Sequence, residues 1–154
     1  MWRAYIILGS NIEPEENIRT AFLLLGEKLR LLRRSSVWET APVGTGGANF
    51  LNLVVEIETD LGVEDLKFNL LRKIEERMGR VRTADKYAPR PIDLDIIWYD
   101  SRVVDDAVWR QAYIAAPLAE LMPNLPTPDG RLLYQLAADL RKSSFAELRL
   151  GISF

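Results

Sequence analysis

The sequence predicts an α+β fold in a single domain that spans residues 1–154. The 154 residues are 48% hydrophobic and 27% charged, the profile of one ordinary globular domain with a real core. Four apolar runs are typical of strands, and two longer segments repeat apolar residues at helical spacing. Their order is strand, helix, strand, strand, helix, strand. This is the ferredoxin-like (βαββαβ) arrangement, an antiparallel sheet with both helices on one face, here followed by a C-terminal extension.

The first half of the chain supplies a strand, a helix and a second strand. Residues 4–8 are apolar and predict a buried first strand. Residues 14–29 predict a helix, because a proline suits its first turn and apolar residues recur at helical spacing. Residues 31–39 predict the second strand. Residues 40–49 hold three glycines and a proline, which indicates a loop.

The second half repeats the pattern and then continues. Residues 50–59 alternate and predict a third strand, residues 63–78 predict a helix that ends at a glycine, and residues 92–99 predict the fourth strand. The extension is expected to hold a short strand at 102–104 and short helices at 118–122 and 132–140. The last dozen residues give no clear signal.

Composition excludes several classes of chemistry. The chain has no cysteine and no histidine, so thiolate nucleophiles, histidine acid–base catalysis and histidine-bound zinc are excluded, and any metal must be bound by oxygen. A net charge of −2 argues against a general nucleic-acid binder. No apolar run approaches a membrane span and no leader is visible, so we expect a soluble cytoplasmic protein without a membrane partner.

The strongest chemical signal is the hexapeptide Arg-Pro-Ile-Asp-Leu-Asp at residues 90–95, which runs into the fourth predicted strand. Residues two apart on a strand share a face, so Asp93 and Asp95 should project together, with Cα atoms roughly 6.5–7 Å apart at ~3.3 Å rise per residue. Two carboxylates on one face repel, and a hard cation such as Mg²⁺ relieves that repulsion. The alternative is a pair of solvated acids on an exposed sheet face.

Nearby basic residues favour the interpretation of Asp93 and Asp95 as a metal site over that of two solvated acids. Arg80, Arg82, Lys86 and Arg90 lie within the same short stretch. Cations next to a metal-binding acidic pair suit an anion that bridges both, which indicates a polyphosphate ligand. As an alternative, Arg80 and Arg82 are solvated charges at the end of a helix.

An ordered set of motifs points to a known family. The motifs occur in segments 8–11 (Leu-Gly-Ser-Asn), 35–42 (Ser-Ser-Val-Trp-Glu-Thr-Ala-Pro), 49–52 (Asn-Phe-Leu-Asn), 79–82 (Gly-Arg-Val-Arg) and 89–96 (Pro-Arg-Pro-Ile-Asp-Leu-Asp-Ile). Over roughly residues 4–130 the chain resembles the 6-hydroxymethyl-7,8-dihydropterin pyrophosphokinases of folate biosynthesis. That resemblance implies transfer of pyrophosphate from ATP to the hydroxymethyl oxygen of a reduced pterin, with release of AMP.

The resemblance also implies the residues of the ATP side. Asp93 and Asp95 would hold two Mg²⁺ ions, and Arg82 and Arg90 would share the catalytic role with them. The ATP-binding residues implied are Glu75, Arg80, Arg82, Arg90 and Arg110. Without the resemblance, Glu75 would pass for a surface charge.

The pterin is flat and aromatic, and such a ligand is best held by aromatic rings and a fixed amide. By resemblance, Asn52 would bind the edge of the pterin, and Phe50 and Tyr113 would lie against its ring. Thr40, Pro42 and Val43 would line the same pocket. The alternative for each aromatic residue is an ordinary place in the core.

One segment departs from the family pattern. Residues 106–113 are shorter than in many members and contain no histidine, with Arg110 next to the position where an arginine is expected. Two alternatives therefore stay open: a relative with an altered pterin substrate or weak activity, and a non-catalytic ferredoxin-like module that binds a nucleotide or RNA. An acidic pair on a central strand disfavours RNA, which prefers exposed aromatics on a basic sheet face.

Overall fold

The computed structural model describes residues 1–44, 47–81, 83–85 and 88–154. Within these residues the strands form one seven-stranded sheet in the order β6-β5-β1-β4-β3-β7, with β2 also paired to β4, and every pairing is antiparallel. The strands are β1 (Trp2–Ser10), β2 (Arg30–Arg34), β3 (Trp38–Thr40), β4 (Phe50–Thr59), β5 (Asp93–Tyr99), β6 (Arg102–Val103) and β7 (Ala146–Leu148). The prediction of an antiparallel sheet with helices packed on it is confirmed.

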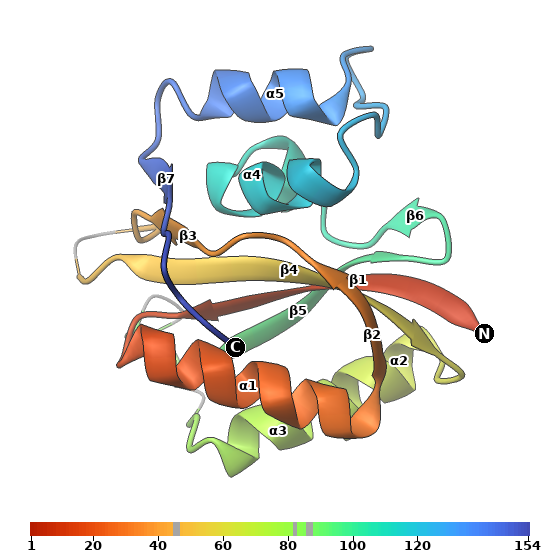
Figure 1. The fold of residues 1–154 in the computed structure, drawn as a ribbon, viewed down its shortest axis with the longest axis vertical. Helices are drawn as coiled ribbons and strands as arrows, with labels where there is room; N and C mark the ends of the chain where they lie inside the picture. Colours follow the sequence, from red (N-terminus) through yellow and green to blue (C-terminus); the bar gives the residue numbers. More distant parts are fainter. Residues whose placement is uncertain (45–46, 82, 86–87) are drawn as a thin grey trace.

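Helices cover both faces of this sheet (Figure 1). One layer is formed by α1 (Pro14–Lys28) and by a helix in three parts, α2 (Val63–Asp65), the π-helical η1 (Leu66–Leu71) and α3 (Arg72–Arg77). The other layer is formed by α4 (Ala112–Leu121) and α5 (Leu133–Leu140), which follow the 3₁₀ turn η2 (Asp106–Trp109). The two helices expected on one face, at 14–29 and 63–78, both lie in the first layer, and the second layer is formed by the helices of the C-terminal part.

Strand residues alternate between the two cores. On β1, Ile6 and Leu8 face the core under α1, whereas Tyr5 and Ile7 face the core under α4 and α5. The same alternation on β5 places Leu94 in the first core. Because Asp93 and Asp95 pair opposite Gly9 and Ile7, the two carboxylates face the α4 side.

The predicted strand at 31–39 is two strands, and the break lies at Ser35. The backbone N–H of Ser35 donates to Val54 O at 2.8 Å, and the Ser35 hydroxyl accepts from Val54 N–H at 2.9 Å. A side-chain oxygen thus replaces a backbone carbonyl, which ends the ladder and lets β3 pair anew with β4.

Helix α4 was predicted only from Leu118, but it begins six residues earlier, at Ala112. The segment is apolar on nearly all sides and contains Pro117, so it shows no helical periodicity. Its C-terminal end is anchored to the sheet. Glu120 accepts from Trp38 Nε1 at 2.6 Å, and Leu121 O accepts from Arg33 at 3.2 Å.

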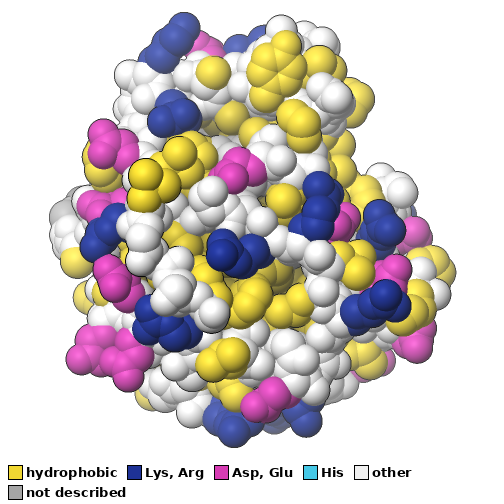
Figure 2. Space-filling view, in the orientation of Figure 1, with side chains coloured by type: hydrophobic (Ala, Val, Ile, Leu, Met, Phe, Trp, Pro, Cys, Tyr) yellow, Lys and Arg dark blue, Asp and Glu magenta, His cyan; other side chains and the backbone are white. Residues whose placement is uncertain are grey.

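The surface in the orientation of Figure 2 carries acidic and basic side chains interspersed, without a patch of one sign. In the part of the chain that the structure describes, no helix has both the length and the apolar character needed to cross a membrane.

Candidate active site

A cavity of about 550 Å³ opens where β1, β4 and β5 meet the beginning of α4. It brings together residues that are far apart in the sequence, on both the acidic and the aromatic side. The predicted site residues that line it are Thr40, Pro42, Val43, Phe50, Asn52, Arg90, Asp93, Asp95 and Tyr113. The structure therefore joins the expected pterin pocket and the expected metal site into one cavity.

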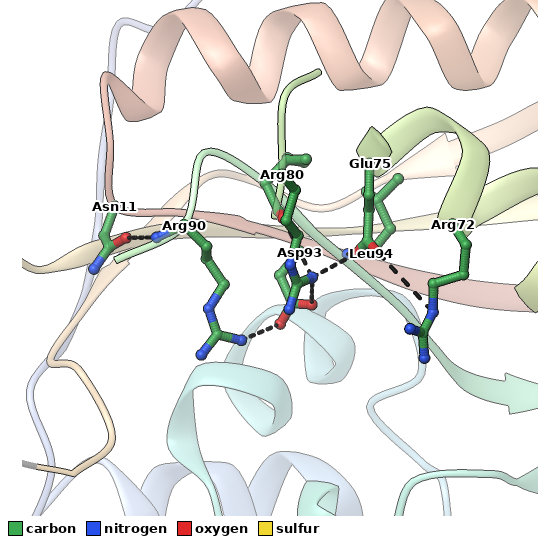
Figure 3. A network of polar contacts seen from close by, with 8 residues as sticks. Asn11, Arg72, Glu75, Arg80, Arg90, Asp93 and Leu94 are labelled. Carbon is green, nitrogen blue, oxygen red and sulfur yellow. Dashed lines mark hydrogen bonds and ion pairs between the residues drawn. The ribbon is translucent and has the colours of Figure 1, made fainter. Parts of the chain in front are cut away.

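Arginines hold Asp93 in place (Figure 3). Arg80 Nη1 lies 2.7 Å from Asp93 Oδ1, and Arg90 Nη1 lies 3.1 Å from Asp93 Oδ2. The Arg90 side chain also lies over the Phe50 ring, with its guanidinium carbon 5.9 Å from the ring centroid. One arginine thus contacts both halves of the cavity.

Asp95 lies partly buried among other carboxyl groups. Burial, together with the charges of Asp93 and Glu75, raises its pKa from 3.8 to about 7. Asp105, which also lines the cavity, adds to this effect. Carboxylate oxygens crowded on one face of a cavity are the donors that a hard divalent cation prefers.

Glu75 and Arg80 lie under the acidic pair and are not among the described residues that line the cavity. Glu75 is 2% exposed, so it is no surface charge; its Oε2 accepts from Arg80 Nη1 at 2.6 Å and from Leu94 N–H at 2.8 Å. The bond from Leu94 N–H to Glu75 and the ion pair of Arg80 with Asp93 tie α3 to the first residues of β5 (Figure 3). Arg80 therefore orients Asp93 directly, and Glu75 orients Arg80.

Of the other two predicted ATP residues, Arg110 lies away from the cavity and Arg82 is not described. Arg110 is 63% exposed and pairs with Asp106 at 3.3 Å, and it is absent from the described lining. Arg82 lies outside the described residues, so its catalytic and ATP-binding roles stay predictions.

The aromatic side of the cavity is built around a fixed amide. Asn52 is 3% exposed and donates from Nδ2 to Thr40 Oγ1 at 2.6 Å. A Cβ on Gly9 would lie 2.7 Å from Asn52 Oδ1, so any larger residue at position 9 would displace this amide. Tyr113 closes the opposite wall, and its pKa is raised to about 12 by burial and by the charges of Asp105, Asp95 and Asp93.

Sequence reasoning missed three functional candidates. Gly9 and Asn11 both line the cavity, and Asn11 Oδ1 accepts from Arg90 N–H at 2.9 Å. Their only signal in the sequence is the Leu-Gly-Ser-Asn motif, which supports the family resemblance but indicates no role for either residue. Asp105 also faces the cavity while its Oδ1 accepts from Ala107 N–H at 3.0 Å. Nothing in the local sequence distinguishes it from a plain cap.

An acidic pair with arginine partners, next to a hollow lined by aromatic rings and an amide, is the kind of site that a kinase for a flat heterocyclic alcohol requires. Residues 5–123 match the model of the 7,8-dihydro-6-hydroxymethylpterin-pyrophosphokinase (HPPK) family. The chain belongs to this family.

Relatives extend the match over most of the chain. A 2-amino-4-hydroxy-6-hydroxymethyldihydropteridine pyrophosphokinase of Pseudomonas aeruginosa is 36% identical over 149 residues, 88% of this chain and 90% of that protein. The Bacillus subtilis protein of the same name is 36% identical over 130 residues, 77% of each chain. A crystal structure of wild-type Plasmodium falciparum HPPK-DHPS aligns with a TM-score of 0.71 at 13% identity. The alignment covers 93% of this chain and 45% of that one, and at this identity it shows the fold alone.

Proposed function

We propose that this protein transfers pyrophosphate from ATP to the hydroxymethyl group of 6-hydroxymethyl-7,8-dihydropterin in folate synthesis, releasing AMP, and that it depends on Mg²⁺. The observation that carries the proposal is the shared cavity, in which the carboxylates of Asp93 and Asp95 and the amide of Asn52 line the same space. The βαββαβ part, whose strands lie in the order β5-β1-β4 with β2 and β3 beyond, supports a ferredoxin-like core with a C-terminal extension.

The two carboxylates suit Mg²⁺, which keeps water and phosphate ligands, and do not by themselves form a metal site made of protein donors alone. Among the described residues no three acidic side chains come together as a metal cluster, and Mg²⁺ usually takes one or two carboxylates and completes its shell with water and phosphate oxygens. Asp93 and Asp95 would hold the two expected ions. When bound, the metal neutralises phosphate charge and lowers the pKa of the attacking hydroxyl.

The side chains of the chain itself orient both substrates. Arg90 lies between the acidic pair and the aromatic side, so its guanidinium can bind a phosphate while Phe50 packs on the pterin. Asn52 would read the amide-like edge of the pterin, and Tyr113 would cover the other side of the ring. Arg82 and Arg110 remain candidates for ATP contacts because of their place in the family pattern. In-line attack on the β-phosphorus then needs little more than this positioning.

The direct test is turnover of 6-hydroxymethyl-7,8-dihydropterin with ATP, followed by chromatography of the nucleotide products. AMP and pterin pyrophosphate should form in equal amounts with Mg²⁺, and chelation by EDTA should stop both. ADP as the product, or turnover that is insensitive to EDTA, would contradict the proposal. Mg²⁺-independent binding of RNA without turnover would favour the binding module instead.

Replacing Asn52 by alanine should separate the two substrates. The variant loses the amide that binds the pterin edge, so the KM for the pterin should rise about 10- to 100-fold, while the KM for ATP stays within about twofold. Steady-state kinetics with each substrate varied in turn measures both values. Asn69→Ala is the matched control, because Asn69 is exposed and donates to Asp65 at 2.8 Å on a helix outside the cavity. A loss confined to ATP would overturn the assignment of Asn52.

A further inference from the structure

Strand β7 lies beyond the residues 5–123 that match the family model, yet it pairs with the strand that leads into the cavity. Phe145 O accepts from Ala41 N–H at 3.2 Å, and Arg149 N–H donates to Val37 O at 2.8 Å. These bonds flank the β3–β7 ladder. Strand β3 is only three residues long, so its place depends on β7 on one side as well as on β4 on the other.

The side chain of Arg149 extends this support to a helix. Its Nη1 lies 2.8 Å from Glu39 Oε1 on β3, and its Nη2 lies 2.8 Å from Glu15 Oε1 in the first turn of α1. One guanidinium therefore joins β7, β3 and α1. The C-terminal end of the chain lies beside α1 in the same way, where Ser153 O accepts from Arg19 Nε at 2.9 Å (Figure 1).

Glu39 passes this support on to the loop at the cavity. Its Oε2 accepts from Asn49 Nδ2 at 3.0 Å, and this hydrogen bond together with Arg149 lowers the pKa of Glu39. In the sequence Glu39 lies before, and Asn49 after, the segment whose described residues are 41–44 and 47–48. Their hydrogen bond closes the neck of the segment that carries Pro42 and Val43 to the cavity.

Arg149 itself cannot touch a bound pterin. It lines a separate hollow of about 480 Å³, together with Glu39 and Asn49, and this hollow shares none of its lining residues with the cavity. Neighbouring residues on β3 point to opposite faces, so Glu39 lies on the α1 side while Thr40 faces the cavity and accepts from Asn52. Any effect of Arg149 on the substrate must pass through β3 and the loop.

We infer that Arg149 is a positioning residue for the pterin-side wall of the cavity. It fixes Glu39, Glu39 closes the loop through Asn49, and the closed loop holds Thr40, Pro42 and Val43 against the pterin. This inference rests on the proposed function for the identity of the ligand.

The test replaces Arg149 by methionine, which keeps the length of the side chain and removes its charge. The KM for the pterin should rise about fivefold because the wall is no longer preorganised, while kcat and the KM for ATP stay within about twofold. The melting temperature should change by no more than about 2 °C, because the ion pairs of Arg149 are partly exposed. Arg149→Lys should recover most of the pterin KM.

Arg131→Met is the matched control. Arg131 also bridges two carboxylates, those of Asp129 and Asp139, and it is similarly exposed, but it lines neither hollow. Neither KM should change in this variant. An unchanged pterin KM in Arg149→Met, or equal rises in both KM values with a lower melting temperature, would overturn the inference.

Two further measurements isolate the route of the effect. Glu39→Gln should raise the pterin KM by itself, and combining it with Arg149→Met should add little, because both changes open the same contact. Additive effects would overturn the route through Glu39. Amide hydrogen exchange needs no turnover: Ala41 and Asn49 should exchange faster in Arg149→Met, and unchanged rates would refute the positioning role even if the wild-type enzyme formed no AMP and the proposed function failed.

Discussion

Replacing Asp95 by asparagine should lower kcat by at least about a thousandfold, because it removes one of the carboxylates proposed to hold the metal against the phosphates. Asparagine keeps the shape of the side chain, so the loss would report on charge rather than packing. Calorimetric titration with Mg²⁺ and a non-hydrolysable ATP analogue should show the same loss as weaker metal-dependent nucleotide binding. Turnover within about tenfold of wild type would remove the metal role of Asp95.

Stability separates this result from misfolding. Burial and then the neighbouring negative charges raise the pKa of Asp95, so its neutral replacement avoids burying a charge and relieves repulsion in the metal-free protein. The metal-free variant should therefore melt no lower than the wild type. Asp106→Asn is the matched control. Asp106 is exposed, follows the cavity residue Asp105 in the chain, and is not among the residues that line the cavity. Its kcat should be unchanged.

Replacing Arg80 by methionine should lower the free energy of unfolding by about 3 kcal/mol, a large share of the stability of a domain of this size. The change removes a 2.6 Å ion pair from Glu75, which is 2% exposed, and a 2.7 Å ion pair from Asp93. Turnover should fall as well, because the start of β5 loses the contact that orients Asp93. Urea unfolding at neutral pH measures the stability loss.

Combining Arg80→Met with Glu75→Gln tests whether the stability is lost because Glu75 is left without its partner. In the double variant the buried carboxylate of Glu75 is no longer left opposite the lost guanidinium and only Asp93 remains, so part of the stability lost in Arg80→Met should return. Arg30→Met is the surface control, because Arg30 is 71% exposed and pairs with Glu58 at 3.6 Å; we expect a change below about 1 kcal/mol. A loss in Arg80→Met no larger than in this control would show that the buried pair adds nothing to stability.

The sequence predicted best where a local period determines geometry. Asp93 and Asp95 share a face because a strand alternates, and this holds whatever the strand packs against. The positions of Asn52, Phe50 and Tyr113 needed the family resemblance, since no local rule brings residues from β4 and α4 to one cavity.

It predicted worst where tertiary contacts override local pattern. The apolar segment that forms α4 has no polar face, so only its burial between β4 and α5 reveals it as a helix. Strand β7 is too short to show alternation and exists through its pairing with β3. Glu75 carries no sign in the sequence that it is buried, because its partners Arg80 and Leu94 come from after the helix.

The edge strands of the sheet give this protein little tendency to form fibres. In the part of the chain that the structure describes, the two ends of the sheet are strands of two and three residues, β6 and β7, and the five-residue β2 carries Arg30, Arg33 and Arg34. A foreign strand would find few unpaired amides at the ends and three arginine side chains along β2. Even at the high protein concentration of a cell, the described strands offer neighbouring copies no long edge on which to add a strand.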